Sequence, residues 1–172
     1  MKNLFSALFL MVPAIVFAQE DPADAVNPEI KKSVYYRNSD IRVTVYDSLS
    51  VGMDYMRVKG KKTVFDYYFR AKDYVNMADD EFSEQLLFAI TLPKSGRFDI
   101  SSHRKSTHVV VYRKSCFCPD GGNYLVKEFH IKGKRIGKTT WAIDAEFMVT
   151  PRPDRGGTPF SKNIQGKFRL AK

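Results

Sequence analysis

Residues 139–149, TTWAIDAEFMV, decide the fold. Apolar side chains recur at every second position from Trp141 to Val149, and polar or small side chains occupy most positions between them. Successive side chains of a β-strand point to opposite faces of its sheet, so this period of two predicts a strand with one buried and one exposed face. Trp141 is in phase with the apolar positions, and we therefore expect it in the core rather than on a sugar-binding surface.

The same alternation recurs along most of the chain. About eight or nine such strands with little helix favour an antiparallel β-sandwich, with an open lipocalin-like β-barrel as the alternative. A turn at Gly60–Lys62 predicts a hairpin, and a loop rich in proline and glycine, residues 151–159, is expected to join the last two strands. The other alternating segments are 41–46, 51–55, 63–69, 86–92 and 164–170.

One segment has a helical pattern. Met77, Phe82 and Leu86 fall near the spacing of three to four residues that places side chains on one face of a helix. Asp79 is a residue type suited to cap a helix at its N-terminus. We expect one short helix within Lys72–Glu84.

The N-terminus predicts export. Residues 1–18, MKNLFSALFLMVPAIVFA, combine a positive Lys2, an apolar run and a small-residue cleavage site, as secretory signal peptides do. The apolar run is shorter than the roughly 20 residues that span a bilayer, so we expect no transmembrane segment after cleavage. Residues 19–33 are expected to form a flexible arm and residues 34–172 a single β-sandwich domain. The protein is therefore expected to be secreted or periplasmic.

Composition and charge narrow the possible functions. With 44% hydrophobic and 27% charged residues in 172, the chain suits one globular domain and is neither a coiled coil, a collagen nor a disordered tail. Between Gln19 and Pro93 there are 10 basic and 13 acidic residues, against 17 and 6 between Lys94 and Lys172. A basic half attracts anionic partners over about a Debye length, ~8 Å at physiological salt.

The densest group of positive charges is the hairpin-like turn KGKRIGK, residues 132–138. We expect a non-catalytic binding module whose basic C-terminal half contacts an anionic polysaccharide, a lipid headgroup or an acidic protein. Nucleic acid is an unlikely partner for an exported protein. Tyrosines at polar-phase positions add contact candidates, because basic residues interleaved with exposed aromatic rings can bind glycans. The candidate binding residues are Lys132, Lys134, Arg135, Lys138, Tyr112 and His130.

The middle of the chain predicts a hairpin. Two alternating segments flank the turn sequence PDGGN, residues 119–123, and a five-residue loop would pair Cys118 with Tyr124. In that register Tyr112 lies opposite His130 on the polar face of the hairpin.

The two cysteines of the chain, Cys116 and Cys118, stand in the sequence SCFCP. The oxidising compartment of an exported protein favours a disulfide. Alternate residues of an extended strand lie about 6.5–7 Å apart at Cα, at the outer edge of what a disulfide tolerates, so the chain would have to kink at Phe117. A bridge closing so small a loop removes little entropy from the unfolded chain and is expected to be comparatively reducible. A reduced or partner-linked pair is the alternative.

Two other functions remain open. A small-molecule or lipid carrier with a β-barrel requires a large internal cavity, whereas a sandwich has a filled core. A metal-dependent or hydrolytic enzyme requires that His103, His108 or the cysteines converge in a pocket. The chain has no Gly-x-Ser-x-Gly elbow, His-Glu-x-x-His helix or glycine-rich phosphate loop. The predicted register also separates His130 from the cysteines by about 13 Å. We therefore predict no catalytic residues, no metal ligands and no cofactor.

Overall fold

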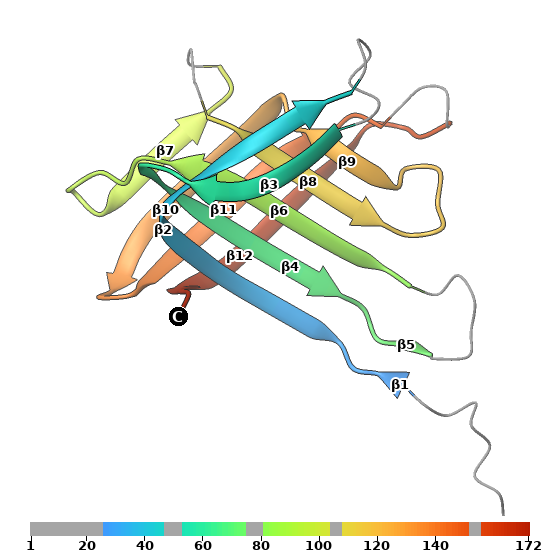
Figure 1. Ribbon diagram of the computed structural model, residues 1–172, viewed down its shortest axis with the longest axis horizontal. Coiled ribbons are helices and arrows are strands. Elements are labelled where there is room, and N and C mark those ends of the chain that lie inside the picture. The colour runs from blue at the N-terminus through green and yellow to red at the C-terminus, as the bar shows by residue number, and fades with distance from the viewer. Residues whose placement is uncertain (1–25, 47–52, 75–80, 104–107, 152–155) are drawn as a thin grey trace, which may run out of the picture.

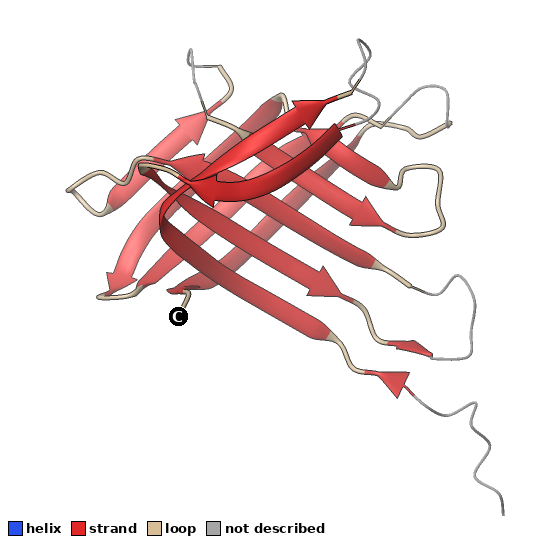
Figure 2. Ribbon diagram, viewed as in Figure 1, coloured by secondary structure: helices blue, strands red, loops and turns tan. Residues whose placement is uncertain are grey.

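The computed structural model describes residues 26–46, 53–74, 81–103, 108–151 and 156–172. Within these residues the chain is all β, with twelve strands and no helix (Figure 2). The predicted fold class is confirmed. The predicted signal peptide lies outside the described residues.

Ten strands form one large sheet, and two short strands, β1 and β5, pair separately. The strands are β1 (Val26–Asn27), β2 (Ile30–Val45), β3 (Met53–Lys59), β4 (Lys62–Arg70), β5 (Asp73–Tyr74), β6 (Ser83–Ile90), β7 (Arg97–Ser101), β8 (Val110–Ser115), β9 (Gly122–Leu125), β10 (Glu128–Gly137), β11 (Thr140–Val149) and β12 (Phe160–Leu170).

The large sheet runs in the order β7-β10-β11-β12-β2-β4-β6-β8-β9, and β3 also pairs with β2. Every pairing is antiparallel except that of β12 with β2, which is parallel. The sheet curls into a half-barrel, so that β7, β10, β11 and β12 lie across from β4, β6 and β8 (Figure 1). We call the concave side of this curl the inner face and the convex side the outer face.

Aromatic rings fill the inner face. The Phe65 ring stacks on Phe88 with centroids 4.9 Å apart. It also meets the edges of Trp141 and Phe168, whose centroids lie 6.2 and 5.6 Å away. These four side chains are at most 2% exposed and come from both halves of the sheet. The curl therefore closes on a packed core, and Trp141 lies in it as its alternation predicts.

A second hydrophobic cluster covers the outer face of β4, β6 and β8. β2 bends at Asn38, whose φ of 51° is left-handed, and its pairing with β4 shifts register there. Beyond the bend, β2 pairs with β3, and the two strands cross the outer face of the sheet (Figure 1). Strands β4, β6 and β8 are therefore buried on both faces. The cluster comprises Ile41, Met53, Val64, Leu87, Ala89 and Val111.

Two local expectations are wrong, and a third falls mainly outside the described residues. The turn at Gly60 joins β3 to β4, but both strands pair with β2 rather than with each other. The expected helix range contains strand residues at its two ends, Asp73–Tyr74 and Ser83–Glu84, and its centre lies outside the described residues. Strand β2 begins at Ile30, inside the segment expected to be a flexible arm.

The predicted central hairpin also has the wrong register. Tyr112 pairs with Tyr124 on β9, not with His130. After four residues of β9 the chain crosses to the other half of the sheet, where β10 pairs with β7 and β11. His130 therefore lies between Ser101 and Glu146. Alternation places a residue on a face but does not select the neighbouring strand, which is why the two segments could be read as one hairpin.

Candidate anion-binding surface

Strands β7, β10, β11 and β12 align their outer-face side chains in rows. One row runs Arg97, Lys134, Ala142, Lys167 across the four strands. Directly opposite side chains of an antiparallel pair have Cβ atoms about 4.5–5.5 Å apart. Strands lie about 4.8 Å apart, so Lys134 and Lys167 start about 10 Å apart, with only the methyl group of Ala142 between them. We call Arg97, Lys134 and Lys167 the basic row.

The basic row differs from its neighbour in charge balance. The adjacent row runs Asp99, Lys132, Asp144, Gln165, so its lysine lies between two carboxylates. In the basic row two cations face each other directly and no acid lies between them. Like charges directly opposite destabilise a sheet, so the basic row is a stability cost that an anion bound over it would offset.

A groove of about 940 Å³ follows these two rows. It brings together cationic groups, carboxylates, one amide and a floor of small residues. Such a mixture offers ion-pairing groups to an anion and hydrogen-bond acceptors to hydroxyl groups. The groove is lined by Arg97, Phe98, Asp99, Lys132, Gly133, Lys134, Ala142, Ile143, Asp144, Gln165, Gly166 and Lys167.

The predicted basic turn is mostly strand, because residues 132–137 belong to β10 and the turn is limited to residues 138–139, and it contributes only part of this surface. Lys132 and Lys134 line the groove, and Lys138 is exposed in the turn beyond β10. Arg135 belongs to the opposite face, where its guanidinium lies 5.2 Å from the ring centroid of Trp141. It therefore covers one end of the core by a cation–π contact.

Sequence reasoning missed Arg97 and Lys167, although both belong to the basic half of the chain. Neither stands in a dense charge cluster: Arg97 is the one cation of RFDIS, and Lys167 has only Arg169 beside it in QGKFR. Only the pairing of β7 and β12 with their neighbours brings them beside Lys134. No local signal identifies them.

Tyr112 is not on the candidate surface. Its side chain is fully buried on the inner face, and its hydroxyl donates to Glu84 Oε2 at 2.8 Å. Burial, followed by the nearby Glu84 carboxylate, raises the pKa of Tyr112. Lys162 Nζ pairs with the same carboxylate at 2.7 Å. Tyr112 therefore holds a buried polar cluster together and cannot reach an anion on the outer face.

His130 is on the outer face, but in the acidic part of it. Its Nε2 lies 2.8 Å from Asp99 Oδ1, and both side chains are about half exposed. His130 and His103 line a pocket of about 740 Å³ that also contains Glu128 and Glu146. This end of the face disfavours anions, so His130 borders the candidate surface without extending it.

The same pocket contains Ser101 and Ser102, whose hydroxyl groups are of the type that acts as the nucleophile of a hydrolase. Ser102 Oγ lies 3.4 Å from His103 Nδ1, whereas Asp99 is bonded to His130. The hydroxyl and the carboxylate thus contact different histidines and do not form the relay that a serine hydrolase requires.

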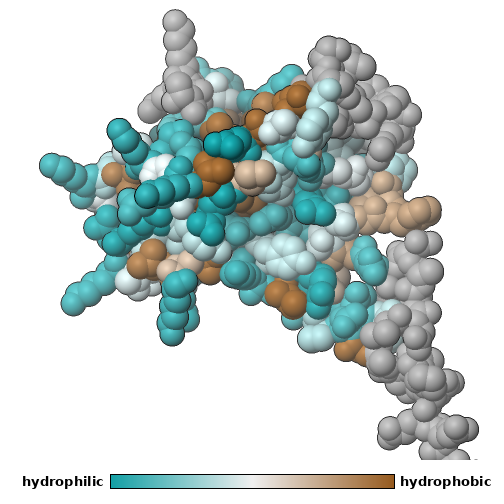
Figure 3. Space-filling model, viewed as in Figure 1, coloured by the Kyte–Doolittle hydropathy of each residue, from teal (hydrophilic) through white to brown (hydrophobic). Residues whose placement is uncertain are grey.

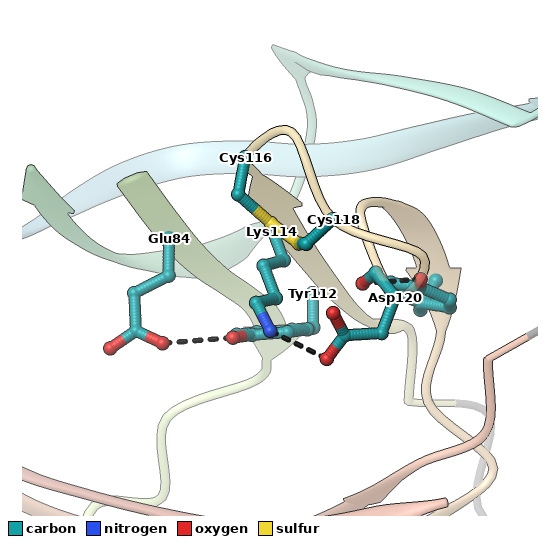
Figure 4. Close-up of a disulfide and its surroundings, with 7 residues drawn as sticks. Glu84, Tyr112, Lys114, Cys116, Cys118 and Asp120 are labelled. Carbon is teal, nitrogen blue, oxygen red and sulfur yellow. Dashed lines mark hydrogen bonds and ion pairs between the residues drawn. A yellow bond between two sulfur atoms is a disulfide. The ribbon is translucent and has the colours of Figure 1, made fainter. Parts of the chain in front are cut away.

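The loop after β8 carries the cysteines. Their sulphur atoms lie at bonding distance, and their Cα atoms are 5.3 Å apart, less than an extended strand allows (Figure 4). β8 ends at Ser115, and the chain bends through Phe117 as a local bridge requires. In the part of the chain that the structure describes, one group of three side chains of the kinds that bind metals has its ligand atoms within 4.8 Å of one another. It consists of Cys116, Cys118 and Asp120. No histidine belongs to it.

No protein-family model, curated protein or solved structure matches this chain. Nor does any helix in the described ranges have the length and apolar character needed to cross a membrane. The site must therefore be interpreted from its own chemistry.

Proposed function

We propose that this protein is an exported binding module that holds an anionic polysaccharide in the groove on the outer face of β7, β10, β11 and β12. The observation that carries the proposal is the basic row, three cations that converge from three strands without an acid between them. The predicted signal peptide supports an extracytoplasmic location, where such polymers are exposed.

A polysaccharide fits the groove better than a purely anionic surface would. Carboxylate or sulfate groups of the polymer would pair with Arg97, Lys134 and Lys167. Its hydroxyl groups would donate hydrogen bonds to Asp99 and Asp144. The same two carboxylates would repel an anionic lipid surface or an acidic protein.

The face of β2, β3 and β4 that is turned to the viewer in Figure 1 offers polar side chains rather than a large apolar surface. Figure 3 shows hydrophilic side chains over most of the visible surface, and long ones project at its left-hand end. Hydrophobic residues are scattered in this view and form no continuous patch. Large apolar patches are typical of protein and membrane contacts. Side chains fill the inner face, and this favours a binding module over a carrier that holds a small molecule or lipid in an internal cavity.

The test is retention on immobilised heparin as a salt gradient is applied. The triple variant Arg97→Ser, Lys134→Ser, Lys167→Ser should elute at lower salt and lose about tenfold in affinity, because three contacts of about 0.5 kcal/mol each are removed. Arg135 is left in place because of its contact with Trp141.

The matched control removes the same charge elsewhere. Lys31, Lys72 and Lys127 are exposed and lie off the basic row, so their triple replacement by Ser should change affinity by less than about threefold. Equal losses in both triple variants would mean that net charge, and not the basic row, determines binding, and the proposed site would be rejected.

A further inference from the structure

We propose that the Cys116–Cys118 bridge is an exchangeable disulfide that accepts electrons from a dithiol protein, and that it is not a structural cross-link. The proposal is independent of the polysaccharide site, because the bridge lies in the loop after β8 and the groove lies on β7, β10, β11 and β12. It rests on the position of the bridge in the fold, on its accessibility and on the charged groups beside it (Figure 4).

The bridge links two positions that are already neighbours along the chain. The two cysteines are separated by one residue, so the bond ties no strand to another. Other contacts hold the loop: Gly121 N–H donates to the Cys118 carbonyl at 3.0 Å, and the Tyr124 hydroxyl donates to the Asp120 carbonyl at 2.7 Å. The loop can therefore keep its conformation when the sulphur atoms separate.

The bridge is open to a partner. Both cysteines are only partly buried and line a shallow pocket of about 280 Å³ at the end of β8. Phe117 lies between them and is 84% exposed, the highest value among the large exposed hydrophobic side chains. A protein that brings a thiolate to either sulphur atom would also cover this ring. Accessible disulfides that close short loops are the labile class.

A charged pair adjoins the sulphur atoms. The Asp120 carboxylate lies within 4.8 Å of both, and Lys114 Nζ forms an ion pair with it. Figure 4 shows this carboxylate and the Lys114 ammonium group on the same side of the loop as the bridge. The carboxylate is close enough to accept the proton of an attacking thiol, directly or through one water molecule, and so to generate the attacking thiolate.

The exchange balances without a further reactant. A thiolate of the partner attacks one sulphur atom of the bridge, the bond between Cys116 and Cys118 breaks, and the other cysteine leaves as a thiolate. The second thiolate of the partner then attacks the mixed disulfide and releases the remaining cysteine. The two cysteines gain two electrons and take up two protons, and the partner is oxidised to its disulfide.

The first experiment is a titration of the native protein with glutathione, followed by alkylation and mass measurement. We expect half-reduction at millimolar reduced glutathione, with the fluorescence of Trp141 unchanged. If the bridge stayed oxidised under these conditions, or opened only together with loss of the native fluorescence, it would be structural and the proposal would be wrong.

The second experiment uses reduced thioredoxin as the protein dithiol. Phe117→Ser should slow reduction by thioredoxin about tenfold, the size of effect expected when an aromatic ring is lost from a contact, and leave reduction by glutathione unchanged. Asp120→Asn should slow both reactions and change their pH profile. Equal slowing of both reductants by Phe117→Ser would mean that the ring only shapes the loop, and would overturn its role in partner contact.

Discussion

At the scale of single residues, polar side chains link the strands that cover the sheet to the sheet itself. The Tyr55 hydroxyl on β3 donates to Gln85 Oε1 at 3.0 Å, and Gln85 Nε2 donates to Asp66 at 2.8 Å. Burial raises the pKa of Tyr55 to about 12 and also raises the pKa of Asp66. A neutral phenol is thus built into the interface between β3 and β6.

The Tyr55 phenol makes stability depend on alkaline pH. The unfolded chain loses this proton near pH 10, whereas the folded protein keeps it to about pH 12. Between these values the folded state holds more protons, so the free energy of unfolding falls as pH rises, by up to about 1.4 kcal/mol per pH unit. In urea unfolding, the free energy of unfolding of Tyr55→Phe should fall less over the same pH range. Parallel curves for the two proteins would contradict the assignment.

At the scale of elements, strand β7 is held to the sheet by an aromatic ring over a glycine. Phe98 pairs with Gly133 on β10, and a Cβ atom at Gly133 would lie 2.2 Å from the Phe98 ring. From there the ring contacts Trp141, with centroids 5.6 Å apart. A ring that covers a glycine on the neighbouring strand fixes register. It therefore also helps to place Arg97 beside Lys134.

Filling the space at Gly133 should loosen β7. Gly133→Ala displaces the Phe98 ring and is expected to lower the free energy of unfolding by about 1–3 kcal/mol in urea. Gly137 on the same strand is the matched control, because a Cβ there would meet Thr140 at an ordinary 3.6 Å. Gly137→Ala should therefore change stability by less than about 0.5 kcal/mol. Similar losses in both variants would show that β10 needs glycine for its backbone and not for the ring.

At the scale of the whole molecule, β4, β6 and β8 join two hydrophobic clusters. Their inner side chains belong to the aromatic core, and their outer side chains pack under β2 and β3. Neither cluster can be lost without exposing one face of the same three strands. We therefore expect the described domain to unfold as one cooperative unit.

The single tryptophan, Trp141, reports only on the inner cluster. Ile41→Ala changes the outer cluster and should lower the free energy of unfolding by about 2–4 kcal/mol. The unfolding midpoints measured by Trp141 fluorescence and by far-UV circular dichroism should nonetheless move together. Met56→Ala on β3 is the control. Because Met56 is 55% exposed, its replacement should change both unfolding midpoints little. If the fluorescence midpoint did not move with Ile41→Ala, the two clusters would unfold independently.

The face that each residue occupies was largely predictable. Trp141 and Phe168 lie inside, as their alternation predicts, whereas Lys132 and Lys134, which were expected in a turn, are outer-face residues of strand β10. The bend at Phe117 followed from the spacing of the cysteines. Tyr112 was assigned to the wrong face. Its hydroxyl donates a hydrogen bond to Glu84, and this bond permits a burial that the polar side chain by itself does not indicate.

The amino-acid sequence by itself determined that this protein is built from β-strands, which side chains of most strands are buried and where positive charge is dense. These properties depend on neighbours along the chain, whose side chains alternate between two faces. Only the tertiary structure decided which strands are neighbours, and so brought Arg97 and Lys167 beside Lys134. The reason is physical: one strand can pair with several others of the same alternation, and the packing of the whole curled sheet selects among them.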